Sequence, residues 1–468
     1  MGLHKKDMSL EELYKINERG KSKRSDHWKR NSGDYTLIGH GVELSNIQKE
    51  IEITIPDQDR NGHFGCFGTT RTGKTKIIEN IIEQDILKGL NVVVIDPKGD
   101  VELFSRVVQA SAEAGRLEEV MFLSPIYTDY SIMLDPLAYY YMEDELVDHV
   151  ISGIKAREDY FIAIAYEVTQ AVIAGLALQA KLKGERLNIN FYDIKARSDW
   201  HNLRTFKDSL QDLSGSQEVT TSIEQILNSP PDFFSKVSSS LRTTLSALTS
   251  GSTGRIIGKS LVNEFVRRFE EARGVILFCN TGSMLARRTA HIIGRVLISM
   301  IQSMLGRFYA SGRKLNPPLS LHIDEGHNML YKGIEELFNK GGAANVYVHF
   351  YTQSIAQIEE EVGKEAARSI IDNINTWVFM LVNHPETARF IELSSPKVKK
   401  FQPILSFGGG ITVREMEENR ILAQNVLRLP KRHFYMRSYG KIYRGITQEV
   451  KPPYVRVEFP HLTPGEGA

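Results

Sequence analysis

The sequence predicts an α/β fold in which a mainly parallel sheet is interrupted by an inserted all-α domain. Three observations predict it. Short β-branched or aromatic runs alternate with amphipathic segments, a glycine-bearing loop joins one run to a helix, and a long middle stretch has helical periodicity with almost no strand signal. The chain has 468 residues, enough for two or three domains, and its 41% hydrophobic and 25% charged residues are typical of a globular protein. The formal net charge of +1 does not itself indicate a nucleic-acid partner, so any basic surface must be local.

The N-terminal residues 1–34 are dense in charge and predict an exposed arm with one short helix around residues 10–16. The polar start excludes a secretory signal. From about Tyr35 to Asp59, alternating apolar and polar residues predict short strands near 42–44 and 51–55.

A repeated alternation of strand and helix then builds the core. The expected strands span residues 63–68, 91–96, 120–123, 275–279, 319–324, 346–351 and 377–382. Several are continuous apolar runs, which suits strands buried on both faces of a parallel sheet. A long amphipathic helix is expected over 289–309.

Five parts of the chain are expected. They are an arm (1–34), the first part of a nucleotide-binding domain (35–141), an inserted all-α domain (142–257), the second part of the nucleotide-binding domain (258–426), and a basic and aromatic β segment with a tail (427–468). The sequence Asn-Ser-Pro-Pro at 228–231 marks a helix break inside the insertion.

Two apolar features have ordinary explanations. Residues 161–180 are as long as a membrane span, but Glu167 near their centre is costly in lipid, so a buried helix is expected and no membrane-spanning segment is predicted. Cys66 and Cys279 sit in apolar runs without metal-binding spacing and are expected to be buried thiols of a cytoplasmic protein.

His322 and His327 flank a strand end, where packed or exposed histidines are favoured over metal ligands.

The sequence contains a complete phosphate-binding loop, GTTRTGKT. Its residues are Gly68, Thr69, Thr70, Arg71, Thr72, Gly73, Lys74 and Thr75. The glycines let successive backbone N–H groups point at phosphate oxygens, Lys74 reaches the β and γ phosphates, and the Thr75 hydroxyl ligates Mg²⁺. A strand leads in and a helix follows, whose N-terminal dipole favours phosphate. The sequence therefore predicts binding of ATP, or another nucleoside triphosphate, with Mg²⁺.

Two further strand ends narrow the reaction. Asp324 and Glu325 follow an apolar strand, where Asp324 would hold Mg²⁺ and Glu325 would polarise the attacking water. Gln353 ends the next strand, where its amide could contact the γ-phosphate or that water. The turn at residues 96–100, DPKGD, follows a strand expected beside the phosphate-loop strand, and by itself is only a turn. An acidic pair in this position favours hydrolysis.

The C-terminal residues 427–456 mix basic and aromatic side chains. Such a mixture could form a nucleic-acid surface, or a β-hairpin turning at Gly440 with the aromatic rings inward and the basic groups outward. The hairpin is favoured.

Together, GTTRTGKT, VVVIDPKGD, LHIDEGHN and the segment from Phe338 to Ser354 resemble the coupling ATPases of conjugative type IV secretion, in particular TraD-like proteins of integrative elements. The resemblance covers about residues 35–450. It implies a RecA-like, hexameric, DNA-dependent ATPase of the HerA/FtsK class that brings relaxase-bound DNA to the secretion channel. It implies that Lys74 and Thr75 bind phosphate and Mg²⁺. It also implies that Asp324 is the acid associated with Mg²⁺, that Glu325 is the catalytic acid, and that Gln353 is the sensor.

The resemblance also implies a positive side chain supplied by the neighbouring subunit. Lys340 is the candidate for it, with Arg287 and Arg288 as rivals. Coupling proteins typically begin with membrane-spanning helices and none is predicted here, so contact with the membrane is expected through partner proteins.

Three functions stay open at this point. The first is a DNA-translocating ATPase that delivers a nucleoprotein substrate and grips DNA, expected to be single-stranded, through its phosphates without sequence preference. The second is a docking adaptor ATPase that recruits protein cargo and never moves DNA. The third is a cytosolic HerA-like motor. A small-molecule kinase is disfavoured by Glu325.

Overall fold

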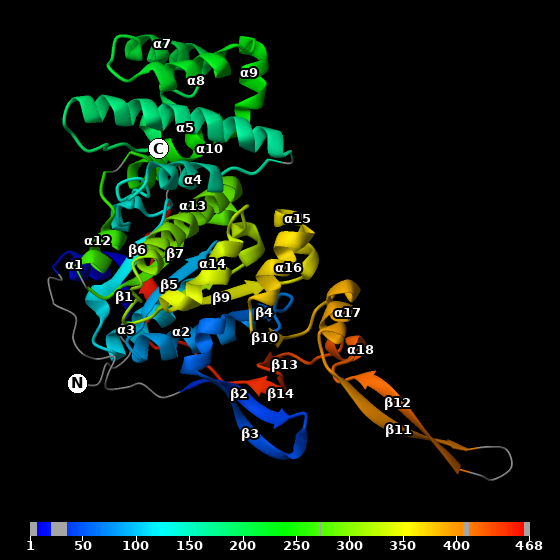
Figure 1. The fold of residues 1–468 in the computed structure, drawn as a ribbon. Helices are drawn as coiled ribbons and strands as arrows, with labels where there is room; N and C mark the ends of the chain where they lie inside the picture. The colour runs from blue at the N-terminus through cyan, green and yellow to red at the C-terminus, as the bar shows by residue number, and fades with distance from the viewer. Residues whose placement is uncertain are drawn as a thin grey trace.

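An eleven-stranded sheet organises the protein in a computed structural model that describes residues 7–19, 35–156, 158–259, 261–271, 273–405 and 411–462 (Figure 1). In sheet order the strands are β3 (Asn46–Pro56), β2 (Tyr35–Glu43), β14 (Lys441–Thr447), β13 (His433–Ser438), β10 (Thr376–Phe379), β4 (Phe64–Phe67), β9 (Val346–Thr352), β8 (Leu319–Ile323), β5 (Asn91–Asp96), β7 (Ile276–Asn280) and β6 (Val120–Leu123). The seven strands from β10 to β6 run parallel, and the first four form an antiparallel extension. All nine strands predicted in residues 42–382 are present.

The position of β5 differs from the expectation. It was expected beside β4, but β9 and β8 lie between them, and β5 pairs with β8 and β7. The neighbours of β4 are β10 and β9. The strand that ends in Gln353 therefore stands next to the phosphate-loop strand, and the strand that ends in the acidic pair is one place further along, so that the carboxyl ends of both can reach a bound ligand.

Helices cover both faces of the parallel part of the sheet. On one face lie α2 (Lys74–Leu87) and α3 (Val101–Glu113), and on the other α13 (Ser283–Ala310), α14 (Glu335–Lys340), α16 (Lys364–Asp372) and α17 (Pro385–Leu393). Alternate residues of β5 divide between the two cores: Val92 and Val94 pack with α2 and α3, whereas Val93 and Ile95 pack on the opposite side. This alternation explains the continuous apolar strands of the sequence.

Residues 142–257 are helical, and their described part contains no strand. The helices are α4 (Glu143–Ser152), α5 (Asp159–Leu182), α6 (Phe191–Lys195), α7 (Trp200–Leu210), α8 (Gln217–Leu227), α9 (Pro231–Val237), α10 (Ser239–Thr249) and α11 (Gly251–Thr253), followed by a π-helical turn at Gly254–Gly258. The predicted break at 228–231 is confirmed between α8 and α9. In Figure 1 α5, α7, α8 and α9 lie together above α13, away from the sheet.

Helix α5 contains the apolar residues 161–180. Over the described residues it is the one helix long and apolar enough, by length and composition, to cross a membrane, and 39% of its apolar window is buried inside the protein. It packs against α4 and α8 as part of the helical region, so the expected buried helix is only partly buried.

The N-terminal segment is not wholly an exposed arm, which corrects the expectation. Helix α1 (Leu10–Arg19) buries Leu10 and Leu13, each 1% exposed, and the short strand β1 (Met8–Ser9) pairs in parallel with β15 (Val457–Glu458) near the C-terminus. Two leucines three residues apart on one helix face are enough to dock this helix. The rest of the charged segment, residues 20–34, lies outside the described residues.

The C-terminal basic segment forms the favoured hairpin, β13 and β14, with its turn at Gly440. Phe434 and Tyr435 are buried, while Lys441 and Arg444 are exposed. Tyr439 departs from the pattern because it sits exposed in the turn, 50% accessible.

A second hairpin was not foreseen. Strands β11 (Lys397–Leu405) and β12 (Ile411–Asn419) form a separate ribbon that projects from the body beyond α17 and α18 (Ala423–Val426) (Figure 1). Cross-strand ion pairs join its lysines and glutamates, for example Lys399 with Glu415.

Candidate nucleotide site

The phosphate-binding loop leaves β4 and is tied to the neighbouring strands by its own backbone. The N–H of Gly68 donates to the carbonyl oxygen of Thr352 at 3.1 Å, and the N–H of Thr69 donates to that of Leu381 at 2.9 Å. Gly73 has φ 114°, a backbone conformation that glycine adopts without strain, and α2 starts at the next residue, Lys74. The loop thus ends at a helix N-terminus, which favours an anion.

The other loop side chains divide by exposure. Thr70 and Arg71 are exposed, and Thr72 is buried, with its hydroxyl donating to the carbonyl oxygen of Thr69 at 2.8 Å. Thr75 is half-buried in the first turn of α2.

Lys74 meets the acidic pair as the sequence predicts. Its Nζ lies 4.0 Å from Asp324 Oδ1 and 3.8 Å from Glu325 Oε1. Both Lys74 Nζ and Asp324 Oδ1 are buried and have no hydrogen-bond partner among the described residues. A buried ammonium group and a buried carboxylate oxygen without hydrogen bonds are costly. A phosphate would satisfy the ammonium group, and Mg²⁺ would satisfy the carboxylate oxygen. The residues therefore fit a bound Mg²⁺ nucleotide.

Glu325 is held by two donors at the end of β8. Gln353 Nε2 lies 3.1 Å from its Oε2, and Lys98 Nζ lies 2.5 Å from its Oε1. Burial raises the pKa of the Glu325 carboxyl, but Lys74 and Lys98 outweigh it, so the net pKa is lowered and the group is a carboxylate at neutral pH. Its φ of 46° is unusual for a residue with a side chain, and such strain is found at functional sites.

Lys98 is the site residue that the sequence did not single out. It belongs to the DPKGD turn, where the buried Asp96 carboxylate accepts from the N–H groups of Lys98 at 2.9 Å and Asp100 at 2.6 Å. Burial, and then the charge of Asp324, raise the pKa of Asp96 to about 7. Gly99 has φ 73°, and a Cβ there would lie 2.5 Å from Asn280 Oδ1, so the turn requires glycine. Only the sheet order places this turn beside the acidic pair, because β5 pairs with β8.

Arg432 also lies beside the loop. Its N–H donates to the carbonyl oxygen of Thr72 at 2.8 Å, and its guanidinium donates to that of Thr447 at 3.0 Å. The antiparallel extension of the sheet thus brings one residue of the basic C-terminal segment to the nucleotide site, which composition alone could not reveal.

Lys340 is not brought to this cluster within the chain. It ends α14, before β9 begins, and its Nζ pairs with Glu336 at 2.5 Å on the surface. Gln353, in contrast, follows the other end of β9. Arg287 and Arg288 are exposed in α13 just after β7, at the same edge of the sheet as the acidic pair. A role for any of the three in a neighbouring subunit stays a prediction.

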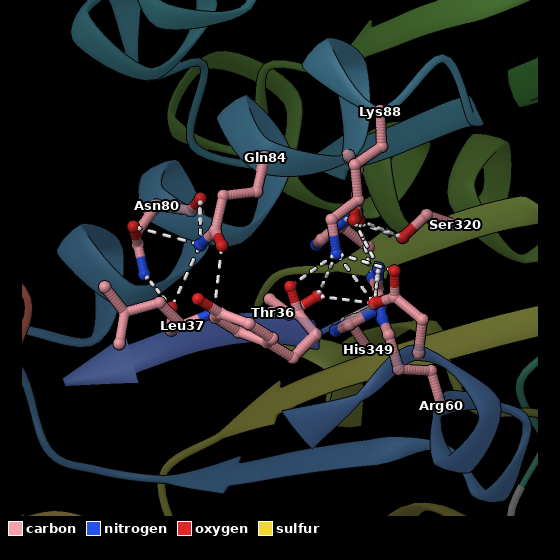
Figure 2. Close-up of polar contacts among 12 residues, drawn as sticks. Thr36, Leu37, Arg60, Asn80, Gln84, Lys88, Ser320 and His349 are labelled. Carbon is pink, nitrogen blue, oxygen red and sulfur yellow. Dashed lines mark hydrogen bonds and ion pairs between the residues drawn. The ribbon is translucent and has the colours of Figure 1, made fainter. Parts of the chain in front are cut away.

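A second polar cluster lies deeper in the sheet. One ligand atom each of Asp85, His322 and His349 fall within 4.8 Å of one another, all buried, as a metal site would require. Arg60, however, already places two nitrogens on Asp85 at 2.5 and 2.8 Å, and a third contact joins it to His349 at 3.1 Å (Figure 2). The cation of this cluster is a guanidinium, so His322 is a packed histidine, as expected.

Comparisons with known proteins agree with the motifs. Residues 318–393 match the family model described as the TraM recognition site of TraD and TraG. The type 4 coupling protein DotL of Legionella pneumophila is 24% identical over 102 residues, which cover 19% of this chain and only 13% of that relative.

Solved structures share the fold over nearly the whole chain. The bacterial conjugative coupling protein TrwB, in a form named deltaN70, has a TM-score of 0.66 at 15% identity, covering 92% of this chain and 93% of that one. TrwB in complex with ADP and Mg²⁺ has a TM-score of 0.63 at 16% identity, covering 93% and 95%. VirB4 of Thermoanaerobacter pseudethanolicus has a TM-score of 0.53 at 10% identity, covering 91% and 98%. The resemblance to type IV coupling proteins and the RecA-like fold with an all-α region are thereby confirmed.

Proposed function

We propose that this chain, which resembles type IV coupling proteins in sequence and fold, is an ATPase that couples a substrate to a type IV secretion channel. The observation that carries the proposal is the convergence of Lys74, Asp324 and Glu325, with a buried ammonium and a buried carboxylate oxygen left without hydrogen bonds. TrwB, which shares the fold, has been solved with ADP and Mg²⁺ and with ATP and GTP analogues.

Each site residue then has a role. The loop from Gly68 to Thr75 binds the phosphates, with Lys74 neutralising their charge. Thr75 and Asp324 would hold Mg²⁺, which would screen the charge that develops on the phosphates. Glu325 accepts the proton of the attacking water, and Gln353 and Lys98 orient its carboxylate.

The finer proposal is that hydrolysis moves DNA. Single-stranded DNA would pass through a ring of this chain, with six copies as the expected number, and be gripped through its phosphates without sequence preference. A relaxase bound to the DNA and components of the secretion channel are the proposed partners. The protein would work in the cytoplasm and reach the membrane through them. Lys340, Arg287 and Arg288 are the proposed sources of a positive charge donated to the neighbouring site.

The test is steady-state ATP hydrolysis with and without single-stranded DNA, over a series of salt concentrations. We expect strong stimulation by DNA that weakens as salt rises and that vanishes in Glu325→Gln. Hydrolysis that ignores DNA at low salt, but is still abolished by Glu325→Gln, would refute the DNA motor and favour the docking ATPase that recruits protein cargo. Absence of hydrolysis under every condition would refute both.

A further inference from the structure

A cavity of about 350 Å³ lies where the helical insertion meets the core. Its walls come from α4 of the insertion, α13 of the core and the segment 331–344. This segment precedes the amino end of β9, whereas Gln353 of the nucleotide site follows its carboxyl end. Ligand pockets in proteins usually measure about 300–1,000 Å³, so the cavity is large enough for a small organic group.

One residue of the cavity wall, His149, has a buried nitrogen without a partner among the described residues. His149 is 1% exposed; its Nδ1 shares a hydrogen bond with Ser299 Oγ at 2.9 Å, while its Nε2 is buried and has no partner among the described residues. Burial lowers the pKa of His149 to about 4, so the ring is neutral at physiological pH. A neutral ring whose Nδ1–H donates to Ser299 leaves Nε2 as an acceptor for a ligand N–H.

Most charged side chains around the cavity form ion pairs, but one carboxylate does not. Glu145 pairs with Arg307 at 3.2 Å, Lys332 with Asp159 at 3.2 Å, and Lys340 with Glu336 at 2.5 Å. Asp148, which also lines the cavity and reaches the surface, forms no ion pair in the described part of the chain. Burial, together with the nearby acids Asp144 and Glu145, raises its pKa. A cation at Asp148 would offset the repulsion from these acids and favour the charged carboxylate.

Gly306 lies on the wall of the cavity. It lies inside α13, where glycine is less favourable than alanine. A Cβ at this position would meet no heavy atom within 4 Å, and its φ is not in the left-handed region. Neither packing nor backbone conformation therefore requires this glycine, and its position on the cavity wall is what distinguishes it.

We propose that this cavity binds an alkylguanidinium group, carried by an arginine side chain of a protein partner or by a free small molecule. The alkyl stem packs against Ile151, Leu305 and Leu337 on the wall. The guanidinium has five N–H donors in a planar fork, enough to donate to the Asp148 carboxylate and to His149 Nε2. Because α4 and α13 both contact it, the ligand would join the helical insertion to the core.

The test is isothermal titration calorimetry on the full chain with n-butylguanidinium, with the neutral analogue n-butylurea, and with the capped peptide acetyl-Leu-Arg-Leu-amide. We expect binding of a guanidinium probe and none of n-butylurea. Asp148→Asn should weaken binding about 10-fold, because a charge-assisted pair is lost. Gly306→Phe should abolish it by filling the cavity from α13.

The controls separate the site from folding and from net charge. Asp144→Asn removes the same charge from the same helix but lies outside the cavity lining, so it should leave binding almost unchanged. Gly306→Phe should keep its urea midpoint and its ATP hydrolysis. If the peptide binds and n-butylguanidinium does not, the natural ligand is an arginine of a protein partner. If n-butylguanidinium binds, a free cation is sufficient to occupy the cavity. No binding of either at millimolar concentration, or equal binding by Gly306→Phe, would overturn the proposal, and neither result depends on ATP hydrolysis.

Discussion

Two polar clusters share the strands β8 and β9 but differ in how their charges are paired. In the buried cluster, both oxygens of the Asp85 carboxylate contact the Arg60 guanidinium, and the Ser320 hydroxyl donates to the same carboxylate at 2.6 Å (Figure 2). At the strand ends, two residues beyond His322, the Lys74 ammonium lies no closer than 3.8 Å to a carboxylate. Charges that are completed by the protein itself stabilise the fold, and charges left incomplete await a ligand.

The histidines strengthen this contrast. His349 also has a nitrogen without a partner, Nδ1, but burial holds its pKa well below the usual value, so the ring is neutral and the missing hydrogen bond costs less than an unpaired buried charge would. A missing partner therefore points to a ligand most strongly when the atom carries a charge, as Lys74 Nζ does. The following predictions test this distinction.

The largest effect is expected at the strand ends. Glu325→Gln should lower kcat for ATP hydrolysis about 1,000-fold, which is about 4 kcal/mol, because the amide cannot accept the proton of water. Nucleotide affinity should change little, since Lys74 and Thr75 remain. The free energy of unfolding should shift by less than about 1 kcal/mol. Hydrolysis rates, nucleotide titration and urea denaturation check the three statements, and a large loss of stability would contradict the division between the two clusters.

The opposite pattern is expected in the buried cluster. Asp85→Asn should lower the free energy of unfolding by about 3 kcal/mol, because it leaves the buried Arg60 without its carboxylate. Urea denaturation measures the loss. The matched control is Asp129→Asn, an exposed acid that lies 4.0 Å from the exposed Arg255, where we expect less than about 1 kcal/mol. Equal losses in the two variants would show that the buried ion pair contributes no more to the free energy of unfolding than the exposed one.

The sequence predicted most of the fold because each core strand carries its own apolar signal. It also predicted Lys74, Asp324, Glu325 and Gln353, which the structure brings together, because they follow recognisable motifs at strand ends. It could not predict the order of the strands, which depends on contacts between distant segments. The role of Lys98 follows from that order alone.

The next effect tests this residue. Lys98→Met should lower kcat about 10-fold with little change in KM, because Glu325 loses a donor that orients it while the phosphate contacts remain. Lys98→Arg should restore part of the rate, since it keeps a positive donor near the carboxylate. If KM rises in proportion and kcat stays constant, Lys98 binds nucleotide instead of orienting Glu325.

The smallest effect, taken over one pH unit, concerns His63, which is buried without a charged partner and extends the contrast to a neutral group. The carbonyl oxygen of Phe338 accepts from Nε2–H at 2.9 Å, and Val348 N–H donates to Nδ1 at 3.2 Å, so only the neutral ring satisfies both. Burial lowers the pKa of His63 from 6.5 to about 4, and the unfolded chain therefore binds a proton before the folded one does. The stability contribution of His63 should be complete above pH 6.5 and fall as the pH drops from 6.5 toward 4, by about 1 kcal/mol for each pH unit.

His63→Gln should be less stable than the wild type at pH 8 but should lose less stability on acidification, whereas the variant of an exposed histidine, His201→Gln, should follow the wild type. Urea denaturation at several pH values measures this, and parallel curves for His63→Gln and wild type would exclude His63 as a source of the pH dependence.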